Sequence, residues 1–223
     1  MDASLDTNVI IDLYKANLQS ILFNRFEKLK VYEFIREQEL KKHADNEILK
    51  LFDKDVDEGK IELITEDYLK KIGMHSSFMF YVNDQKILYE GSDLGEVYAI
   101  ALAKTLGCIC LVTDDIKERG PHYTLMRTID SDVIPLAFYE ILLLDYLEGT
   151  LTEEELLNLF NTINDLSNLK MNFYSKLKNF IKRFWRDPYT ESEKEWMQNF
   201  CKANNLKPME KINRLWAYIK KNG

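Results

Sequence analysis

The sequence is poor in the residues that build several common kinds of site. Its 223 residues include 3 cysteines and 3 histidines. Cys108, Cys110 and Cys201 form an odd set without metal-ligand spacing, which disfavours a disulfide framework or a zinc site. Cys108 and Cys110 lie one residue apart in a predicted strand, so we expect buried free thiols in a reducing compartment. The histidines share no spacing with each other or with a cysteine, and no histidine-based catalysis is predicted.

Long apolar runs and secretory signals are also absent. No stretch of about 18 apolar residues occurs, as a membrane-spanning helix would require. The opening residues MDASLD have neither the basic start nor the apolar core of a signal peptide. There is no internal repeat and no low-complexity tract, and 46% hydrophobic with 30% charged residues is an ordinary globular composition. We therefore expect a cytoplasmic protein without a membrane partner.

Charge is divided unevenly along the chain. Residues 1–149 contain 17 basic and 28 acidic residues, a net charge of −11, whereas residues 150–223 contain 13 and 9, a net charge of +4. The positive surplus is concentrated from residue 167 onward, where 13 basic residues accompany 5 acidic ones. This division, together with Gly149 as a break, predicts a domain of residues 1–149 and an extension of residues 150–223.

Strand and helix patterns alternate through the first part. Strands are expected at residues 4–5, 28–34, 60–65 and 108–113, and residues 131–138 fit either an edge strand or the start of a helix. Helices are expected after Asp6, over 35–59, after Thr65 and over 92–107, whereas the middle of the chain before residue 92 is poorly patterned. The alternation predicts an α/β fold with a mostly parallel central sheet flanked by helices.

The extension is predicted to be entirely helical. Thr152 and Glu155 have the spacing of a capping box at the start of a helix. Five apolar residues of the next helix fall on one face, namely Phe173, Leu177, Phe180, Ile181 and Phe184. Pro188 and Pro208 accompany two further amphipathic segments.

Carboxylates follow several of the predicted strands. Asp6 interrupts the apolar run SLDTNVIIDL where the first strand ends, and Asp114 and Asp115 follow the strand at 108–113. Because functional groups gather at the carboxyl ends of parallel strands, we expect these acids at one edge of the sheet. Glu39, after the second strand, and Glu96, in the first turn of helix 92–107, are expected at the same edge.

A carboxylate cluster without histidine or cysteine suits Mg²⁺ or Mn²⁺. Such ions neutralise a phosphodiester and lower the pKa of a bound water molecule. The residues therefore predict hydrolytic cleavage of phosphodiester bonds.

Two blocks of the sequence resemble the PIN-domain nucleases. SLDTNVIIDL is similar to the opening of that family, and DLGEVYAIALAKTLGCICLVTDD is similar to its central block. The resemblance covers about residues 3–145. It implies a PIN-like α/β sandwich and a metal-dependent ribonuclease, often the toxin of a toxin–antitoxin pair. It also implies RNA as substrate, an antitoxin or other regulatory protein as partner, and a homodimer.

The resemblance assigns roles to individual residues. The matched acids are Asp6, Glu39, Glu96, Asp114 and Asp115. Asp6, Glu96 and Asp115 would bind the metal, with Asp114 as a neighbour that shares the role. Glu39 matches the second acid, and Glu37 is an alternative at that position. Thr113 and Asn8 match supporting polar residues.

Each of these residues also has a purely structural interpretation. Asp6 fits a helix cap, Glu39 a solvated surface residue, Glu96 a first-turn acid favoured by the helix dipole, and Asp114 a turn. A nuclease acting on structured DNA and a non-catalytic module with the same fold are alternatives to the ribonuclease.

The basic residues carry a separate prediction. The candidate RNA contacts are Arg119, Lys178, Lys182 and Arg183. Basic residues interleaved with aromatics bind phosphates and stack on unpaired bases. The same pattern also fits an ordinary helical core with a solvated lysine face, or a surface on which a protein partner docks.

Overall fold

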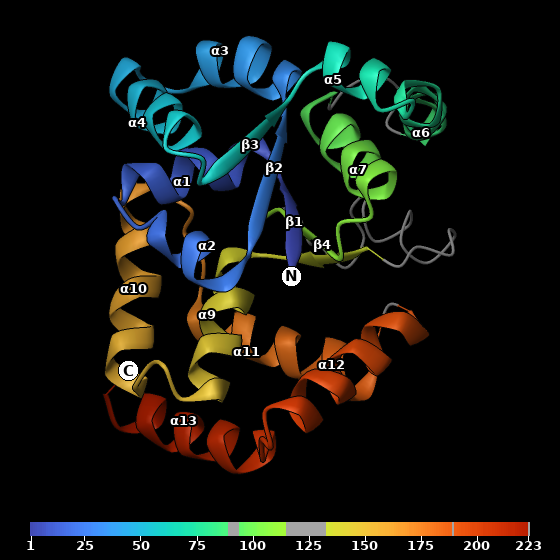
Figure 1. The fold of residues 1–223 in the computed structure, drawn as a ribbon. Coiled ribbons are helices and arrows are strands. Elements are labelled where there is room, and N and C mark those ends of the chain that lie inside the picture. The colour runs from blue at the N-terminus through green and yellow to red at the C-terminus, as the bar shows by residue number, and fades with distance from the viewer. Residues whose placement is uncertain (89–93, 115–132, 189, 223) are drawn as a thin grey trace. The chain divides into compact units, whose positions relative to one another are not determined.

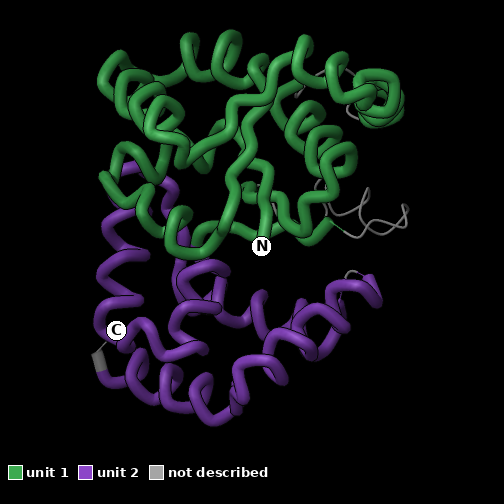
Figure 2. The backbone as a smooth tube through the Cα atoms, viewed as in Figure 1, with its two compact units in different colours: residues 1–138 green, residues 139–223 purple. Residues whose placement is uncertain are grey.

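The computed structural model describes residues 1–88, 94–114, 133–188 and 190–222. The chain forms two compact units, residues 1–138 and 139–223, which Figure 2 shows in green and purple. The predicted boundary after Gly149 lies 11 residues later in the chain than this division. Helix α9 (Phe138–Glu148) belongs almost wholly to the second unit. The Tyr146 hydroxyl lies 2.9 Å both from Glu153 Oε1 and from the backbone carbonyl oxygen of Lys211, which ties α9 to the helices that follow it.

The first unit is built on a five-stranded sheet with the order β3-β2-β1-β4-β5. All four strand pairs are parallel. The strands are β1 (Asp2–Leu5), β2 (Lys28–Tyr32), β3 (Ile61–Ile64), β4 (Cys110–Val112) and β5 (Ile134–Leu136). The α/β fold and the parallel sheet are thus confirmed (Figure 1). Both alternatives for residues 131–138 occur in the described part of this segment, where edge strand β5 leads into α9.

Helices cover both faces of this sheet. Helices α1, α2 and α4 lie on one side and α6 and α7 on the other (Figure 1). The bounds are α1 (Thr7–Lys15), α2 (Ser20–Arg25), the π-helix η1 (Ile35–Leu40), α3 (Lys41–His43), α4 (Asn46–Asp57), α5 (Glu66–Lys71), α6 (His75–Leu88) and α7 (Leu94–Leu106). The predicted helix over 35–59 is interrupted before Asp45, because this side chain caps α4 by accepting from the Glu47 and Ile48 N–H groups.

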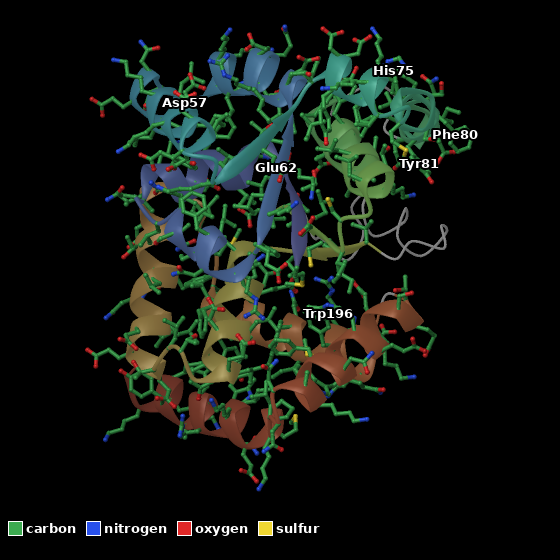
Figure 3. All side chains as sticks on the ribbon, viewed as in Figure 1. Asp57, Glu62, His75, Phe80, Tyr81 and Trp196 are labelled. Atoms are coloured by element: carbon green, nitrogen blue, oxygen red, sulfur yellow. The ribbon has the colours of Figure 1, made fainter. Side chains whose placement is uncertain are left out.

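Helix α6 occupies the stretch that showed no pattern in the sequence. Phe78, Val82 and Gln85 are fully buried on its inner side. Phe80 and Ile87 are 67% and 79% exposed, and Figure 3 shows Phe80 at the outer side of the helix. Since large apolar residues occur on both faces, no single apolar stripe marks this helix.

The central strands are covered on both faces. Cys108 and Cys110 are buried free thiols, as predicted, and β4 is buried along its whole length. Helix α7 packs against β1, β2 and β4 and is apolar on most sides for that reason. Among the helices of the described ranges, none has the length and apolar character needed to cross a bilayer.

The second unit is helical throughout its described part. Its further helices are α10 (Glu153–Leu166), α11 (Phe173–Ile181), the π-helix η2 (Lys182–Arg186), α12 (Glu191–Ala203) and α13 (Pro208–Asn222). The capping box is present: Glu155 N–H donates to Thr152 Oγ1 and Thr152 N–H donates to Glu155 Oε2. The predicted apolar face of residues 173–184 is buried.

Candidate functional site

The strand order places a topological switch point between β1 and β4. The chain builds outward from β1 through β2 to β3 and then returns to the other side of β1 with β4 and β5. Connections diverge at such a point, and ligands of open parallel sheets bind beside the carboxyl ends of the strands there. Asp6 directly follows β1 and Thr113 directly follows β4.

These two residues are joined by hydrogen bonds. The Asp6 backbone N–H donates to the Val112 carbonyl at 3.0 Å, and Thr113 Oγ1 donates to Asp6 Oδ2 at 3.2 Å. Asp6 is 2% exposed and Thr113 is fully buried. Burying a carboxylate costs free energy unless its oxygens are satisfied, so the pair is a fixed polar centre at the switch point.

Asp6 also caps helix α1. Its Oδ1 accepts from the Thr7 N–H at 2.6 Å, while Oδ2 accepts from Thr113. The structural interpretation of Asp6 is therefore correct, and it is compatible with a role in a site. A carboxylate held through both oxygens has a defined orientation, which is what a metal ligand or an electrostatic residue needs.

Gly95, at the start of α7, brings a second group of residues to Asp6. A Cβ atom placed on Gly95 would lie 3.1 Å from Thr7 Oγ1, 3.5 Å from Glu39 Cγ and 3.8 Å from Asp6 Oδ1. Glu39 and Asp6 thus lie within 4 Å of the same point, although 33 residues separate them in the sequence. Only the contact with Thr7 Oγ1 would be crowded, so the missing side chain of Gly95 lets α7 approach Thr7 closely.

The structure distinguishes Glu39 from Glu37. Glu39 is 26% exposed and faces Gly95, and its Oε2 lies 3.5 Å from His43 Nε2. Glu37 is 41% exposed and pairs with Lys41 and Arg36. The hydrogen bond from Lys41, with that from Arg36, lowers the pKa of Glu37. Both acids lie on the π-helix η1, and the wider turns of π-helices often occur at functional sites.

Glu96 follows Gly95 in the first turn of α7 and is 3% exposed. A carboxylate in this turn is favoured by the helix dipole, as expected. Glu96 is therefore a buried acid that follows, in the sequence, the glycine beside Asp6 and Glu39.

Of the remaining residues predicted near the strand ends, Asp114 and Asn8 are described. Asp114 Oδ1 accepts from the Phe138 N–H at 3.3 Å and so holds the start of α9. Asn8 is exposed on α1. Asp115 and Arg119 lie outside the described residues.

Arg183 is not a surface cation, which corrects its assignment as a candidate RNA contact. It is 3% exposed and donates to Glu140 and Glu193, both of which are buried. Lys178 and Lys182, from the same stretch, are exposed as predicted.

The donor chemistry at Gly95 fits a hard divalent cation. Asp6, Glu39 and Glu96 offer carboxylate oxygens, the ligands that Mg²⁺ and Mn²⁺ prefer. Within the described part of the chain, no group of three or more His, Cys, Asp or Glu side chains is arranged to hold a metal ion. Mg²⁺ or Mn²⁺ at this edge stays a prediction from the residue types.

Two residues of the site were not singled out in the sequence. Thr7 is 6% exposed, and its buried hydroxyl has no hydrogen-bond partner among the residues with described positions. Gly95 supplies the space beside it. Both residues stand beside residues that were singled out: Thr7 lies inside Asp-Thr-Asn, and Gly95 directly precedes Glu96. The sequence alone does not show, however, that the start of α7 lies close to Thr7.

Comparisons of the chain with protein-family models, with curated proteins and with solved structures find no significant match.

Proposed function

We propose that the first unit is a PIN-like nuclease domain and that the protein hydrolyses RNA phosphodiester bonds with Mg²⁺ or Mn²⁺. One observation carries the proposal. Asp6 and Glu39 meet at Gly95, beside the hydrogen bond between Thr113 and Asp6, at the switch point of a parallel sheet. The resemblance of the two sequence blocks to PIN-domain nucleases supports the same reaction. The toxin role, with its antitoxin, stays a prediction from that resemblance.

Each residue contributes a definable function in this proposal. Asp6 presents a carboxylate whose orientation is fixed by Thr7 and Thr113. Glu39 and Glu96 add negative charge from two other elements. The described side chains of the three acids do not surround one point, so binding of the ion would have to draw them together. A bound Mg²⁺ or Mn²⁺ supplies charge neutralisation for the phosphodiester and a water of lowered pKa. No protein nucleophile is then required.

The first test compares two aspartates that both cap helices. Asp6→Asn removes the charge at the proposed site, whereas Asp45→Asn removes a charge at the exposed cap of α4. Asparagine caps helices as well as aspartate does, so both variants should fold. A mixed RNA pool is incubated with each protein and with Mg²⁺, Mn²⁺ or EDTA. We expect metal-dependent cleavage by the natural chain and by Asp45→Asn, and none by Asp6→Asn.

Other outcomes are equally informative. Equal cleavage by all three proteins would assign the activity to a contaminant or to another site. Cleavage of branched or single-stranded DNA in preference to RNA would favour the DNA nuclease. No cleavage, with no heat of Mg²⁺ or Mn²⁺ binding in calorimetry, would favour the non-catalytic module.

A further inference from the structure

The π-helix η1 buries both of its ends. Ile35 and Leu40, its first and last residues, are fully buried, although they stand five positions apart. Five residues make about 1.4 turns of an α-helix, so an α-helical segment would turn one of these two side chains away from the core. In a π-helix the backbone hydrogen bonds join residues five apart, so both side chains can face inward. The direction of each side chain between them therefore depends on the π form.

Glu39 takes its direction from this wider turn. It directly precedes Leu40, and its Cγ lies 3.5 Å from the point that a Cβ atom on Gly95 would occupy. If η1 relaxed to an α-helix while Ile35 stayed in place, Leu40 would turn out of the core and Glu39 would turn with it. The proposed site thus depends on a helical form that is rare and occurs mostly as single turns.

Arg36 joins η1 to helix α4. Its Nε donates to Asp53 Oδ1 at 2.7 Å, and its Nη2 donates to Asp53 Oδ2 at 2.7 Å. Two parallel bonds between a guanidinium and a carboxylate fix orientation as well as distance. Arg36 also pairs with Glu37, the next residue of η1. Because Arg36 directly follows Ile35, these bonds oppose rotation of the first turn of η1.

Helix α4 is a firm support for this link. Phe52, the residue before Asp53, is fully buried. The Tyr14 hydroxyl donates to Asp55 Oδ2 at 2.8 Å, which ties α4 to α1. A functional side chain is held most precisely when its supporting residues lie on packed elements of this kind. Asp53 therefore offers Arg36 a partner of fixed position.

We infer that Arg36 is a positioning residue of the proposed site: its bonds to Asp53 hold η1 in the π form that directs Glu39 toward Gly95. The inference deepens the proposed nuclease function, on which it rests for the role of Glu39 as a metal ligand. Mutation of a residue that orients a metal ligand typically lowers metal affinity about 10- to 100-fold. Arg36 acts in this way without touching the ion or the RNA.

The direction of one effect separates positioning from charge. Arg36→Gln removes a positive charge near the proposed cation site, which by electrostatics would strengthen the binding of Mn²⁺. If Arg36 positions Glu39, the same variant weakens that binding. Mn²⁺ is titrated into each metal-free protein, and its affinity is measured by calorimetry. Lys60→Gln is the matched control, because it removes the same charge from a lysine that pairs with Asp55 of α4 at 3.0 Å.

We expect Arg36→Gln to lower the Mn²⁺ affinity about 10- to 100-fold and Lys60→Gln not to lower it. Asp53→Asn should lower the affinity as well, whereas Asp45→Asn, at the cap of the same helix, should not. Adding Arg36→Gln to Glu39→Gln should cause no further loss, because the ligand that Arg36 positions is already absent. The urea midpoint of the first unit, followed by circular dichroism, should change little, since the Arg36 and Asp53 side chains are 21% and 35% exposed.

A second measurement needs no metal. The double variant Glu39→Cys with Gly95→Cys should form a disulfide when oxidised glutathione is supplied, because a Cβ atom on Gly95 lies 3.5 Å from Glu39 Cγ. Mass spectrometry of unreduced peptides gives the cross-linked fraction. Adding Arg36→Gln should reduce this fraction, and adding Lys60→Gln should leave it unchanged.

Three results would overturn the inference. They are an Mn²⁺ affinity of Arg36→Gln equal to or above that of the natural chain, a further loss when Arg36→Gln is added to Glu39→Gln, and a cross-linked fraction that Arg36→Gln does not change. If the natural chain neither binds Mn²⁺ nor cleaves RNA, the proposed function fails, while the cross-link still decides whether Arg36 directs Glu39. If Mn²⁺ binding needs Glu39 but not Arg36, the positioning role fails and the proposed function stands.

Discussion

Replacing Arg183 by methionine should destabilise the second unit severely. The guanidinium Nη1 lies 2.6 Å from Glu140 Oε2, and Nε lies 3.1 Å from Glu193 Oε1. The three side chains are 3%, 2% and 2% exposed. Methionine fills a similar volume but leaves two carboxylates buried without their shared cation.

The magnitude follows from this burial. Removing one partner of a buried ion pair costs about 3–5 kcal/mol, because the other charge stays desolvated. Arg214 is the matched control, since it also pairs with a glutamate, Glu153, but is 64% exposed. Arg214→Met should cost at most about 1 kcal/mol.

The chain offers a selective assay for this unit. Its tryptophans are Trp185, Trp196 and Trp216, all of which lie within residues 139–223. Figure 3 marks Trp196 on α12. Urea unfolding followed by tryptophan fluorescence therefore reports on the second unit alone.

A triple variant distinguishes the cost of leaving carboxylates buried without a cation from the cost of lost side-chain packing. Changing Arg183 to Met together with Glu140→Leu and Glu193→Leu removes all three buried charges. Replacing a buried ionic cluster by apolar residues is often neutral or stabilising, so most of the lost stability should return. The reasoning is refuted if Arg183→Met costs no more than Arg214→Met, or if the triple variant is the least stable of the three.

Three further predictions concern other parts of the chain. Gly95→Ala should reduce RNA cleavage more than it reduces the urea midpoint of the first unit, followed by circular dichroism, because its Cβ would press on Thr7 Oγ1 at 3.1 Å while alanine favours the helix. Burial alone would raise the pKa of Glu153, but hydrogen bonds from its own backbone N–H and from neighbouring side chains lower it. The stabilisation is thus fully present above the ordinary pKa of 4.5 and is lost as pH falls through the lower folded pKa. The urea midpoint of Glu153→Gln should therefore lie below that of the natural chain at pH 7, and the difference should shrink as the pH is lowered below 4.5. Burial raises the pKa of Cys108 to about 11, so a thiol reagent at pH 8 should modify the half-buried Cys201 first, as mass spectrometry of the labelled peptides would show.

The sheet was predictable because its strands are short, apolar and separated by recognisable helix caps. Asp6 and Thr65 mark two helix starts correctly, and the apolar β4 indicated a strand covered on both faces. Helix α6 was not predictable in the same way, since Phe80 and Ile87 place apolar side chains on its exposed face. The predicted domain boundary at Gly149 follows the end of α9, whereas the two compact units divide at the first residue of that helix.

The site was predictable where it depends on strand ends. Asp6 and Thr113 meet because parallel strands bring their carboxyl ends to one edge. The choice between Glu37 and Glu39 depends on the π-helix η1, whose wider turn has no clear sequence signature. Arg183 was misassigned because charge patterns do not reveal which cation of a basic stretch faces inward toward Glu140.

The central position of β1 has a consequence for how the first unit folds. β1 pairs with β2 at residues 28–30 but with β4 at residues 110–112. One edge of β1 therefore stays unpaired until a strand about a hundred residues downstream has joined the sheet. Pairings of such sequence separation close large loops and form slowly. Until β4 docks, the open edge of β1 is exposed to other chains, and Asp6 has no Thr113 beside it. We therefore expect the sheet to be the slow-folding, aggregation-prone part of the chain, and its acidic centre to be assembled only at the last step.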